Sequence, residues 1–453
     1  MSALSRDIHK SHPELNVHEF RQEKPVPSYA VVIAVGSLRE RECNKRISIF
    51  AEEKTFQSHV DRFRYKAIEN MLVYAEHNLC GPYTWGRYDI CVLPPSIAHF
   101  EIECPCVTFV SPLLLGGDSS YIVSSLARNI SQSWAGNLVT CCNYEHLWLN
   151  KSFSIFISRK IKRKMLYHED IDVFLQREGL KNLNSLIPRK PADAVLLRCL
   201  LPNLKGTSEL PHIITKYVPY ERGYFLLCHL EHILGGPTVF EPFLQSYFND
   251  FSRQSINTTD WLNYLRQKFL DKVELLDGVE WRVWFNRIFF TFSMPVMTLW
   301  EEKCFTLAEK LIKYETRDVL PLTADVNNLH DVQKIILLKC LHSSHRRLTT
   351  ETLNSIPASF FHYSRNYEIR YLWLLLCIKV RCDEKVKPAL KFAVKYCSPN
   401  YACCIFKYLC KWEIMRPQTM RIFHENEEKM LDDTREKLNK ILYPSNLFLS
   451  ELV

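Results

Sequence analysis

The sequence predicts a mainly helical α+β protein with a small mixed sheet. Short β-branched runs occur in the first hundred residues, and from residue 300 onward the apolar residues recur almost throughout at helical spacing. Only 12 of the 453 residues are glycine, so few sharp turns are available and long helical stretches are expected. Apolar residues make up 47% and charged residues 24%, a balance typical of a globular chain with a sizeable core.

The N-terminal third supplies the strand candidates. The run at 29–38 predicts a buried strand, 40–56 a second strand with a turn, and 87–96 a strand stopped by two prolines. Between them, 58–79 carries apolar residues at helical spacing: Phe63, Ile68, Met71, Leu72 and Ala75.

The middle of the chain predicts capped helices. Asp118 and Ser119 can cap a helix that runs to about Trp134, and a second helix covers 145–164. The next two are a helix over 219–236 closed by a glycine pair and a helix over 258–269 that opens with a Thr cap. After an apolar connector at 290–300, helices such as 329–347 and 367–381 predict a separate all-helical C-terminal domain, in which stacked helix pairs are plausible.

A basic run, "RKIKRK" at 159–164, places five positive charges in six positions. We interpret it as a solvated helix end; a targeting signal or a nucleic-acid patch is the alternative. The net charge of +8 is mild and no nucleic-acid module is visible, so we expect no nucleic-acid partner.

Cysteine usage and hydropathy bear on the compartment. The 17 cysteines include two adjacent pairs and form no small-domain disulfide framework, which favours a reducing environment. The first residues lack the apolar core of a signal peptide, and no uncharged apolar run reaches the roughly 18–20 residues that span a bilayer. We expect a cytoplasmic protein without a membrane span.

Four ordered segments carry a family resemblance: "PCVTFVSPLLLGGD" (105–118), "RNISQSWAGNLVT" (128–140), "YEHLWLNKSF" (144–153) and "VPYERGYFLLCHLE" (218–231). Together they resemble the gluzincin aminopeptidases, the M1 family, on the branch of leukotriene A(4) hydrolase and aminopeptidase B. The resemblance implies a thermolysin-like (peptidase M1) domain at 27–287 and an armadillo-like α-helical C-terminal domain at 301–453. It also implies that 1–26 is a remnant of the family's N-terminal β domain or a linker, and that 288–300 is a linker.

The departures from the family pattern fall on its metal site. The family binds zinc through H-E-x-x-H on one helix and a Glu on the next, and the Glu of the motif takes a proton from the zinc-bound water. Here the first His is Arg128, the catalytic Glu is Asn129, the second His is Gln132 and the third ligand is Lys151. Two permanent cations repel Zn²⁺ and the amides are poor donors, so we expect no metal and no catalytic residue.

Other family site positions are mixed. The exopeptidase motif G-G-M-E-N reads "FEIEC", which keeps Glu103 as the candidate group for a peptide amino end. Tyr220 matches the tyrosine that stabilises the oxyanion. The turn that receives the substrate carboxylate aligns with "CSPNY", and Ser398 and Asn400 replace its basic residues.

With these replacements, the resemblance implies an inactive aminopeptidase homologue. We expect it to need no cofactor and to act by binding peptides or an active relative. A residual zinc aminopeptidase and a truncated product without an independent role are the alternatives. Most of the N-terminal β domain has no counterpart here, so a partner could cover the apolar face it would leave.

Whether Arg128 and Lys151 form a new anion site or reflect drift stays open. Two histidine pairs, His229 with His232 and His342 with His345, lack further ligands, so we expect no metal there.

Overall fold

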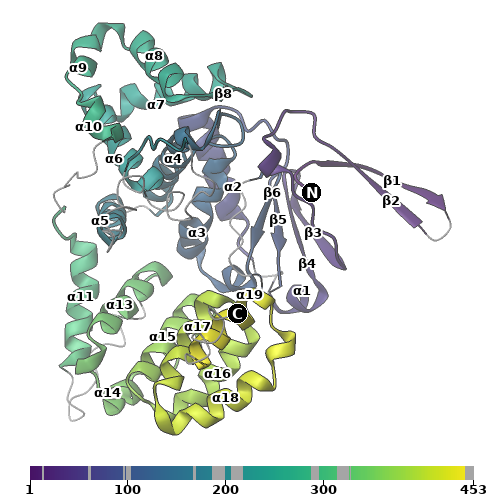
Figure 1. The fold of residues 1–453 in the computed structure, drawn as a ribbon, viewed down its shortest axis with the longest axis vertical. Helices are drawn as coiled ribbons and strands as arrows, with labels where there is room; N and C mark the ends of the chain where they lie inside the picture. Colours follow the sequence, from purple (N-terminus) through teal and green to yellow (C-terminus); the bar gives the residue numbers. More distant parts are fainter. Residues whose placement is uncertain are drawn as a thin grey trace.

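The computed structural model describes residues 1–12, 15–59, 63–94, 97, 104–166, 170–185, 199–205, 218–286, 295–313, 326 and 328–443. An N-terminal body (residues 28–286) stands above a helical C-terminal body (residues 299–443), and a β-hairpin reaches out sideways (Figure 1). This is the predicted mainly helical fold with a small mixed sheet.

A mixed sheet forms one flank of the N-terminal body, with strand order β3-β4-β5-β6. The strands are β3 (Leu38–Asn44), β4 (Ile47–Glu52), β5 (Asp89–Val92) and β6 (Val107–Val110). β3 and β4 are antiparallel, whereas β5 and β6 join in parallel, so β4 to β6 are buried strands with few polar residues. A two-residue parallel pair, β7 (Thr140–Cys141) with β8 (Ser255–Ile256), lies apart from it.

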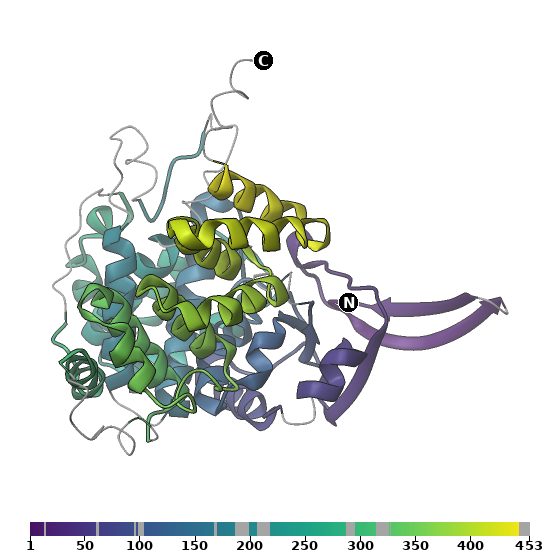
Figure 2. The ribbon, with the colours of Figure 1, turned by 90° about the horizontal axis from the view of Figure 1, so that it is seen from below.

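The strand predicted at 29–38 is wrong. Residues 28–30 form a single 3₁₀ turn, 31–37 belong to no element, and β3 begins only at Leu38. Val31, Ile33 and Val35 are more than half exposed, so this β-branched run has no neighbouring strand on that side. Upstream, β1 (Leu4–His12) and β2 (Leu15–Arg21) pair as a hairpin that projects away from the body, as Figure 2 shows from below.

The helices of the N-terminal body follow the predicted order. Phe63, Ile68, Met71, Leu72 and Ala75 are buried as expected, although 58–79 is divided between α1, α2 and a π-helical turn at 75–80. α8 opens on Asn257 and not on a threonine, because Asn257 and Asp260 form a capping box. The helices are α1 (Glu53–His59), α2 (Lys66–Tyr74), α3 (Ser119–Gln132), α4 (Trp148–Leu166), α5 (Asp170–Ser185), α6 (Val218–Ile233), α7 (Pro237–Asp250), α8 (Thr258–Lys268), α9 (Val273–Asp277) and α10 (Trp281–Asn286).

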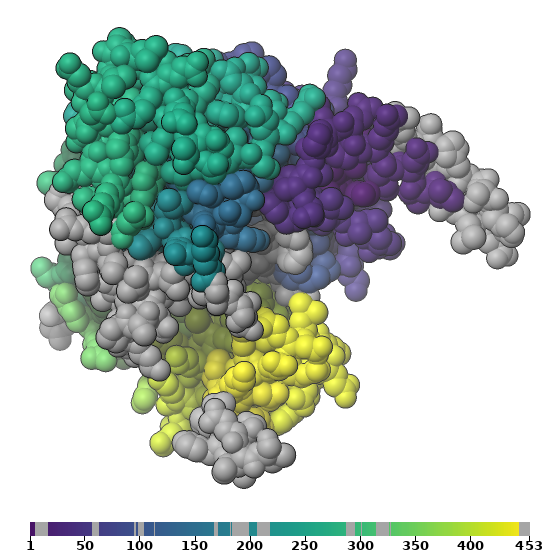
Figure 3. Space-filling model, turned by 45° about the horizontal axis from the view of Figure 1, so that its top comes forward, coloured from purple at the N-terminus to yellow at the C-terminus, as the bar shows by residue number. Residues whose placement is uncertain are grey.

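Among its described residues, the C-terminal body contains helices and their connections but no strand, as predicted. α11 packs on α13, α13 on α15, α15 on α17 and α17 on α19, so alternate helices form a stacked layer. Figure 3 shows these helices, in green to yellow, beneath the N-terminal body. They are α11 (Leu299–Ile312), α13 (Asp331–Ser343), α14 (Thr350–Ser355), α15 (Tyr367–Lys379), α16 (Val386–Lys395), α17 (Pro399–Cys410), α18 (Arg416–His424) and α19 (Asp432–Leu442).

Each body has its own apolar core, and specific contacts join the two. A small cluster links Phe174 of α5 with Cys304 of α11 and Ile336 of α13. The N-termini of α3 and α13 also cap each other. The Asp118 carboxylate accepts from the Asp331 N–H (3.1 Å), and the Asp331 carboxylate accepts from the Asp118 N–H (3.0 Å).

Candidate functional site

Three helices of the N-terminal body carry the candidate site residues. α3 is capped by Asp118, and Ile122, Leu126 and Ile130 along one face are buried, which fixes its orientation. α4 packs on α3, and α6 packs on α4, at the centre of the body (Figure 1). Arg128, Asn129 and Gln132 lie in the second half of α3, Lys151 lies in the first turn of α4, and Tyr220 lies in the first turn of α6.

Two cations converge on the ring of Tyr220. The Arg128 guanidinium carbon lies 5.5 Å from the ring centre, and the Lys151 ammonium nitrogen lies at the same distance. Both distances are within the range of a cation–π contact, and Tyr220 is only 9% exposed. The folded chain therefore brings together three of the residues that the sequence singled out.

Serine hydroxyls hold the three helices at close range. Ser131 Oγ of α3 donates to the Ser154 carbonyl of α4 (2.7 Å), and Ser152 Oγ of α4 donates to the Pro219 carbonyl of α6 (2.5 Å). At Gly223 of α6, an added Cβ would collide with Ser152, so only glycine permits this approach. The site residues thus sit on a closely packed frame.

The interpretation of "RKIKRK" as a solvated helix end is wrong for its first residues. Arg159 is buried and donates to both carboxylate oxygens of Glu221, at 3.1 and 2.8 Å. Lys160 is partly buried between Glu231 and Glu241, at 2.6 and 2.9 Å. These carboxylates lie more than sixty residues away in sequence, and only the last two residues, Arg163 and Lys164, are exposed.

Lys162 is a partly buried cation of α4 that the sequence reasoning missed. Burial, with Arg159 and Arg128 nearby, lowers the pKa of its ammonium group to about 7. A signal was present, because Lys162 follows Lys151 by eleven residues, which is close to three helical turns and places both on one face of α4.

The residues present do not fit a zinc ion. Zinc takes imidazole, thiolate or carboxylate donors, whereas these positions hold a guanidinium, two amides and an ammonium group. Among the described residues, no group of three or more His, Cys, Asp or Glu side chains could hold a metal. Glu103, the candidate for the peptide amino end, lies outside the described residues.

The two positions aligned with the carboxylate-binding turn have different surroundings. Ser398 precedes α17, and its hydroxyl is buried with no hydrogen-bond partner within the described ranges. Asn400 is exposed, and its carbonyl accepts from the Tyr371 hydroxyl at 3.3 Å. Neither supplies a cation for a carboxylate.

The histidine pairs and cysteines have ordinary surroundings. His229 stacks on Trp284, and burial lowers the pKa of His342 to about 4. All 17 cysteines are free thiols. No helix in the described part of the chain has the length and apolarity required to cross a bilayer.

Solved structures define the class of protein to which this arrangement of helices belongs. The native leukotriene A4 hydrolase of Saccharomyces cerevisiae superposes with a TM-score of 0.85 at 24% identity, over 97% of this chain and 71% of the yeast chain. An M1 zinc metallopeptidase of Deinococcus radiodurans has a TM-score of 0.50 at 19% identity, over 66% of this chain and 62% of its own. The fold is that of an M1 metallopeptidase.

Sequence relatives narrow the class to a family. The Peptidase family M1 domain matches residues 63–284, and the C-terminal domain of leukotriene A4 hydrolase matches residues 329–442. Leukotriene A-4 hydrolase of Xenopus laevis is 35% identical over 461 residues, which cover 98% of this chain and 72% of the frog protein. Leucine aminopeptidase 2 of Kluyveromyces lactis is 34% identical over 300 residues, 65% of this chain and 44% of the yeast protein. The chain belongs to peptidase family M1, with the C-terminal domain of the leukotriene A4 hydrolases.

Proposed function

We propose that this chain is a catalytically inactive M1 homologue that acts by binding peptides or a protein partner. The observation that carries the proposal is the pair of cations, Arg128 and Lys151, each 5.5 Å from the centre of the Tyr220 ring. A divalent cation at such a site would meet two like charges at close range, and no carboxylate stands at the general-base position. The helical frame is kept, but the groups that would activate water are replaced.

The same charges suggest which ligand the site would take. Arg128 and Lys151 concentrate positive charge around the Tyr220 ring, which favours a carboxylate over an ammonium group. We therefore propose that the site prefers peptides with acidic side chains or a free carboxyl end. This ligand preference differs from that of an aminopeptidase, which must bind a free amino end.

Hydrolysis is tested by release of a fluorophore from aminoacyl substrates, with and without a chelator and with and without added zinc. We expect no turnover above a buffer blank in any arm, because general base and ligands are both replaced. Turnover that a chelator abolishes and zinc restores would contradict the proposal.

Peptide binding is tested by the thermal transition of the purified chain with acidic and with basic peptides. We expect the acidic peptides alone to raise the midpoint, since a ligand of the folded state stabilises it. The double variant Arg128→Gln with Lys151→Gln should lose this response. The matched control, Arg163→Gln with Lys164→Gln, removes two exposed charges from the end of α4 and should keep it. Equal responses of both variants would contradict the site.

A residual zinc aminopeptidase is the second candidate function. The retained Tyr220, at the position that stabilises the oxyanion in the family, is the feature that favours it. We also propose a cytoplasmic location and the domain limits 27–287 and 301–453. A further proposal is that a partner covers the exposed residues Val31, Ile33 and Val35.

A further inference from the structure

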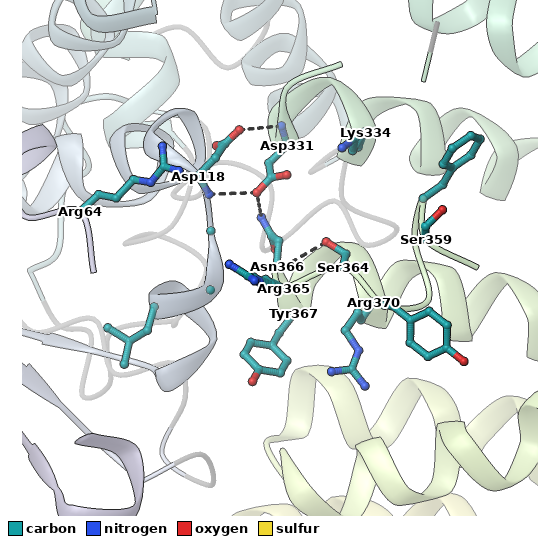
Figure 4. A pocket seen from close by; sticks show the side chains of 15 residues that line it. Arg64, Asp118, Asp331, Lys334, Ser359, Ser364, Arg365, Asn366, Tyr367 and Arg370 are labelled. Atoms are coloured by element: carbon teal, nitrogen blue, oxygen red, sulfur yellow. Dashed lines mark hydrogen bonds between the residues drawn. The ribbon is translucent and has the colours of Figure 1, made fainter. Parts of the chain in front are cut away.

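A second candidate site lies where the two bodies meet. A cavity of about 740 Å³ opens between the N-terminal end of α3 and the helices α13 and α15 (Figure 4). Arg128 lies ten residues further along α3, which at 1.5 Å per residue is about 15 Å from this end. The cavity is therefore separate from the cations around Tyr220.

Four cations line this cavity. They are Arg64 from the segment before α2, Lys334 of α13, Arg365 from the loop before α15 and Arg370 of α15. None of the four forms an ion pair with a residue that the structure describes. Four positive charges from both bodies thus face one space.

The two carboxylates in the wall are already engaged. Asp118 accepts from the Asp331 and Tyr121 N–H groups and from the Ser120 hydroxyl. Asp331 accepts from the Asp118 N–H and from the Asn366 amide, both at 3.0 Å, as the dashed lines in Figure 4 show. Both carboxylates serve as helix caps, and their two negative charges offset only part of the four positive charges.

Arg370 lines the cavity and contacts an aromatic ring. Its guanidinium carbon lies 5.6 Å from the centre of the Tyr367 ring, which orients the group. Its Nε atom is buried and has no hydrogen-bond partner within the described ranges. This buried atom does not face the open cavity, so an anion there would have to accept from another N–H of the guanidinium.

The wall is also partly aromatic. Phe360, Tyr363 and Tyr367 line the cavity; Tyr363 is 73% exposed and offers an open ring face, whereas Phe360 and Tyr367 are buried. Flat faces beside arginines suit a ligand that combines a ring with negative charge. A volume of this size falls in the range of small-molecule sites and exceeds what inorganic phosphate needs.

We propose that this cavity binds a small organic phosphate, of the nucleoside diphosphate class. The phosphates would lie among Arg365, Arg370 and Lys334, and the ring would lie against the aromatic wall. These groups belong to the C-terminal body, and Arg64 lines the cavity from the N-terminal body. The proposal does not depend on the function proposed for the Tyr220 site.

Titration calorimetry on the full chain with ADP, pyrophosphate and adenosine tests the proposal. We expect ADP to bind with a Kd below about 1 mM, pyrophosphate more weakly and adenosine not measurably. Absence of ADP binding at that concentration, or adenosine binding as tightly as ADP, would overturn the proposal. Pyrophosphate binding as tightly as ADP would contradict the role of the aromatic wall.

Variants locate the binding. The double variant Arg365→Gln with Arg370→Gln should weaken ADP binding by about tenfold or more, since each arginine loses a charged contact. If the double variant fails to fold, Lys334→Gln on α13 is a milder substitute. We expect it to weaken ADP binding several-fold. The control Lys387→Gln with Lys391→Gln removes two exposed charges from α16 and should bind as the unmodified chain. A control that weakens binding as much as the double variant would reduce the site to a general charge effect and refute it.

Discussion

At the scale of single residues, the chain combines positive charge with burial at several points of one region. Arg159 is matched by Glu221, so its burial is compensated by charge-assisted hydrogen bonds. Lys162 is in the opposite position, because its charged neighbours include Arg159 and Arg128. The two residues, three positions apart on α4, should therefore respond in opposite directions to removal of charge.

Loss of the Glu221 carboxylate should be costly. Glu221→Gln leaves the Arg159 guanidinium buried without its counter-charge, and we expect unfolding free energy to fall by about 3 kcal/mol in urea denaturation. Glu309→Gln, which breaks the exposed pair with Arg347, is the control and should cost less than about 0.5 kcal/mol. Similar costs for the two variants would show that the buried pair has no special role.

Replacement of Lys162 should have an effect that depends on pH. Its folded-state pKa is about 7 and its ordinary value is 10.5, so the unfolded state holds the proton more tightly. The penalty for the buried charge is therefore complete below about pH 7 and shrinks as pH rises toward the ordinary value. Lys162→Met should stabilise the fold most at about pH 6, and the gain should decline by about pH 9 in urea denaturation. The exposed Lys164→Met should show no such trend, and a gain that grows with pH would contradict the assignment.

At the scale of elements, the helices that carry Arg128, Gln132 and Lys151 keep the family's fold, and we propose that these positions no longer bind a metal. The cap at Asp118, the buried face of α3 and the serine bonds between helices involve none of the four replaced positions. Backbone geometry and ligand chemistry are thus separable in this chain.

Reintroducing the family's residues tests that separation. The variant with Arg128→His, Asn129→Glu, Gln132→His and Lys151→Glu should bind about one zinc per chain by elemental analysis after dialysis. The matched variant that retains Lys151 should bind zinc at least about a hundredfold more weakly, because a cation replaces one of three ligands. A folded fourfold variant without zinc would show that the helices no longer hold ligand geometry.

What the sequence could predict also differs by element. The Asp118 cap and the glycine pair at 235–236 are local signals, and the structure has both helix ends where they were predicted. The run at 29–38 has strand-like residues but no neighbouring strand, and pairing is a property of the fold that the run itself does not contain. The basic run of α4 was misread because its acidic partners are distant in sequence.

The candidate site, like the fold, could be predicted only in part from the sequence. The family resemblance located Arg128, Lys151 and Tyr220 by position, and the structure brings them together. The cavity between the bodies depends on how distant segments meet, and no local pattern predicts it. Only the helical spacing from Lys151 gave a signal for Lys162.

At the scale of the whole molecule, two bodies with separate cores share a close interface. The reciprocal caps of Asp118 and Asp331 join α3 to α13, and an added Cβ at Gly116 would collide with the backbone carbonyl of Arg365. The segment before α3 therefore packs so closely against the C-terminal body that no side-chain carbon fits between them.

A single methyl group added at this interface should lower the free energy of unfolding. Gly116→Ala forces the two backbones apart, and we expect a loss of about 2 kcal/mol in unfolding free energy. At Gly36 an added Cβ would meet nothing within 4 Å, so Gly36→Ala is the control and should change stability by less than about 0.5 kcal/mol. Equal stability of both variants would mean that the bodies are less tightly joined than this contact implies.

Replacement of the metal ligands by cations is the central claim, and the metal content of the native chain tests it most directly. Native mass spectrometry of the intact chain, purified in the presence of zinc and then dialysed, reports the bound ion without reference to any substrate. The cations Arg128 and Lys151 beside Tyr220 predict a mass equal to that of the polypeptide alone. A mass higher by one zinc ion, lost in the Gln132→Ala variant, would place a metal at this site and contradict the account.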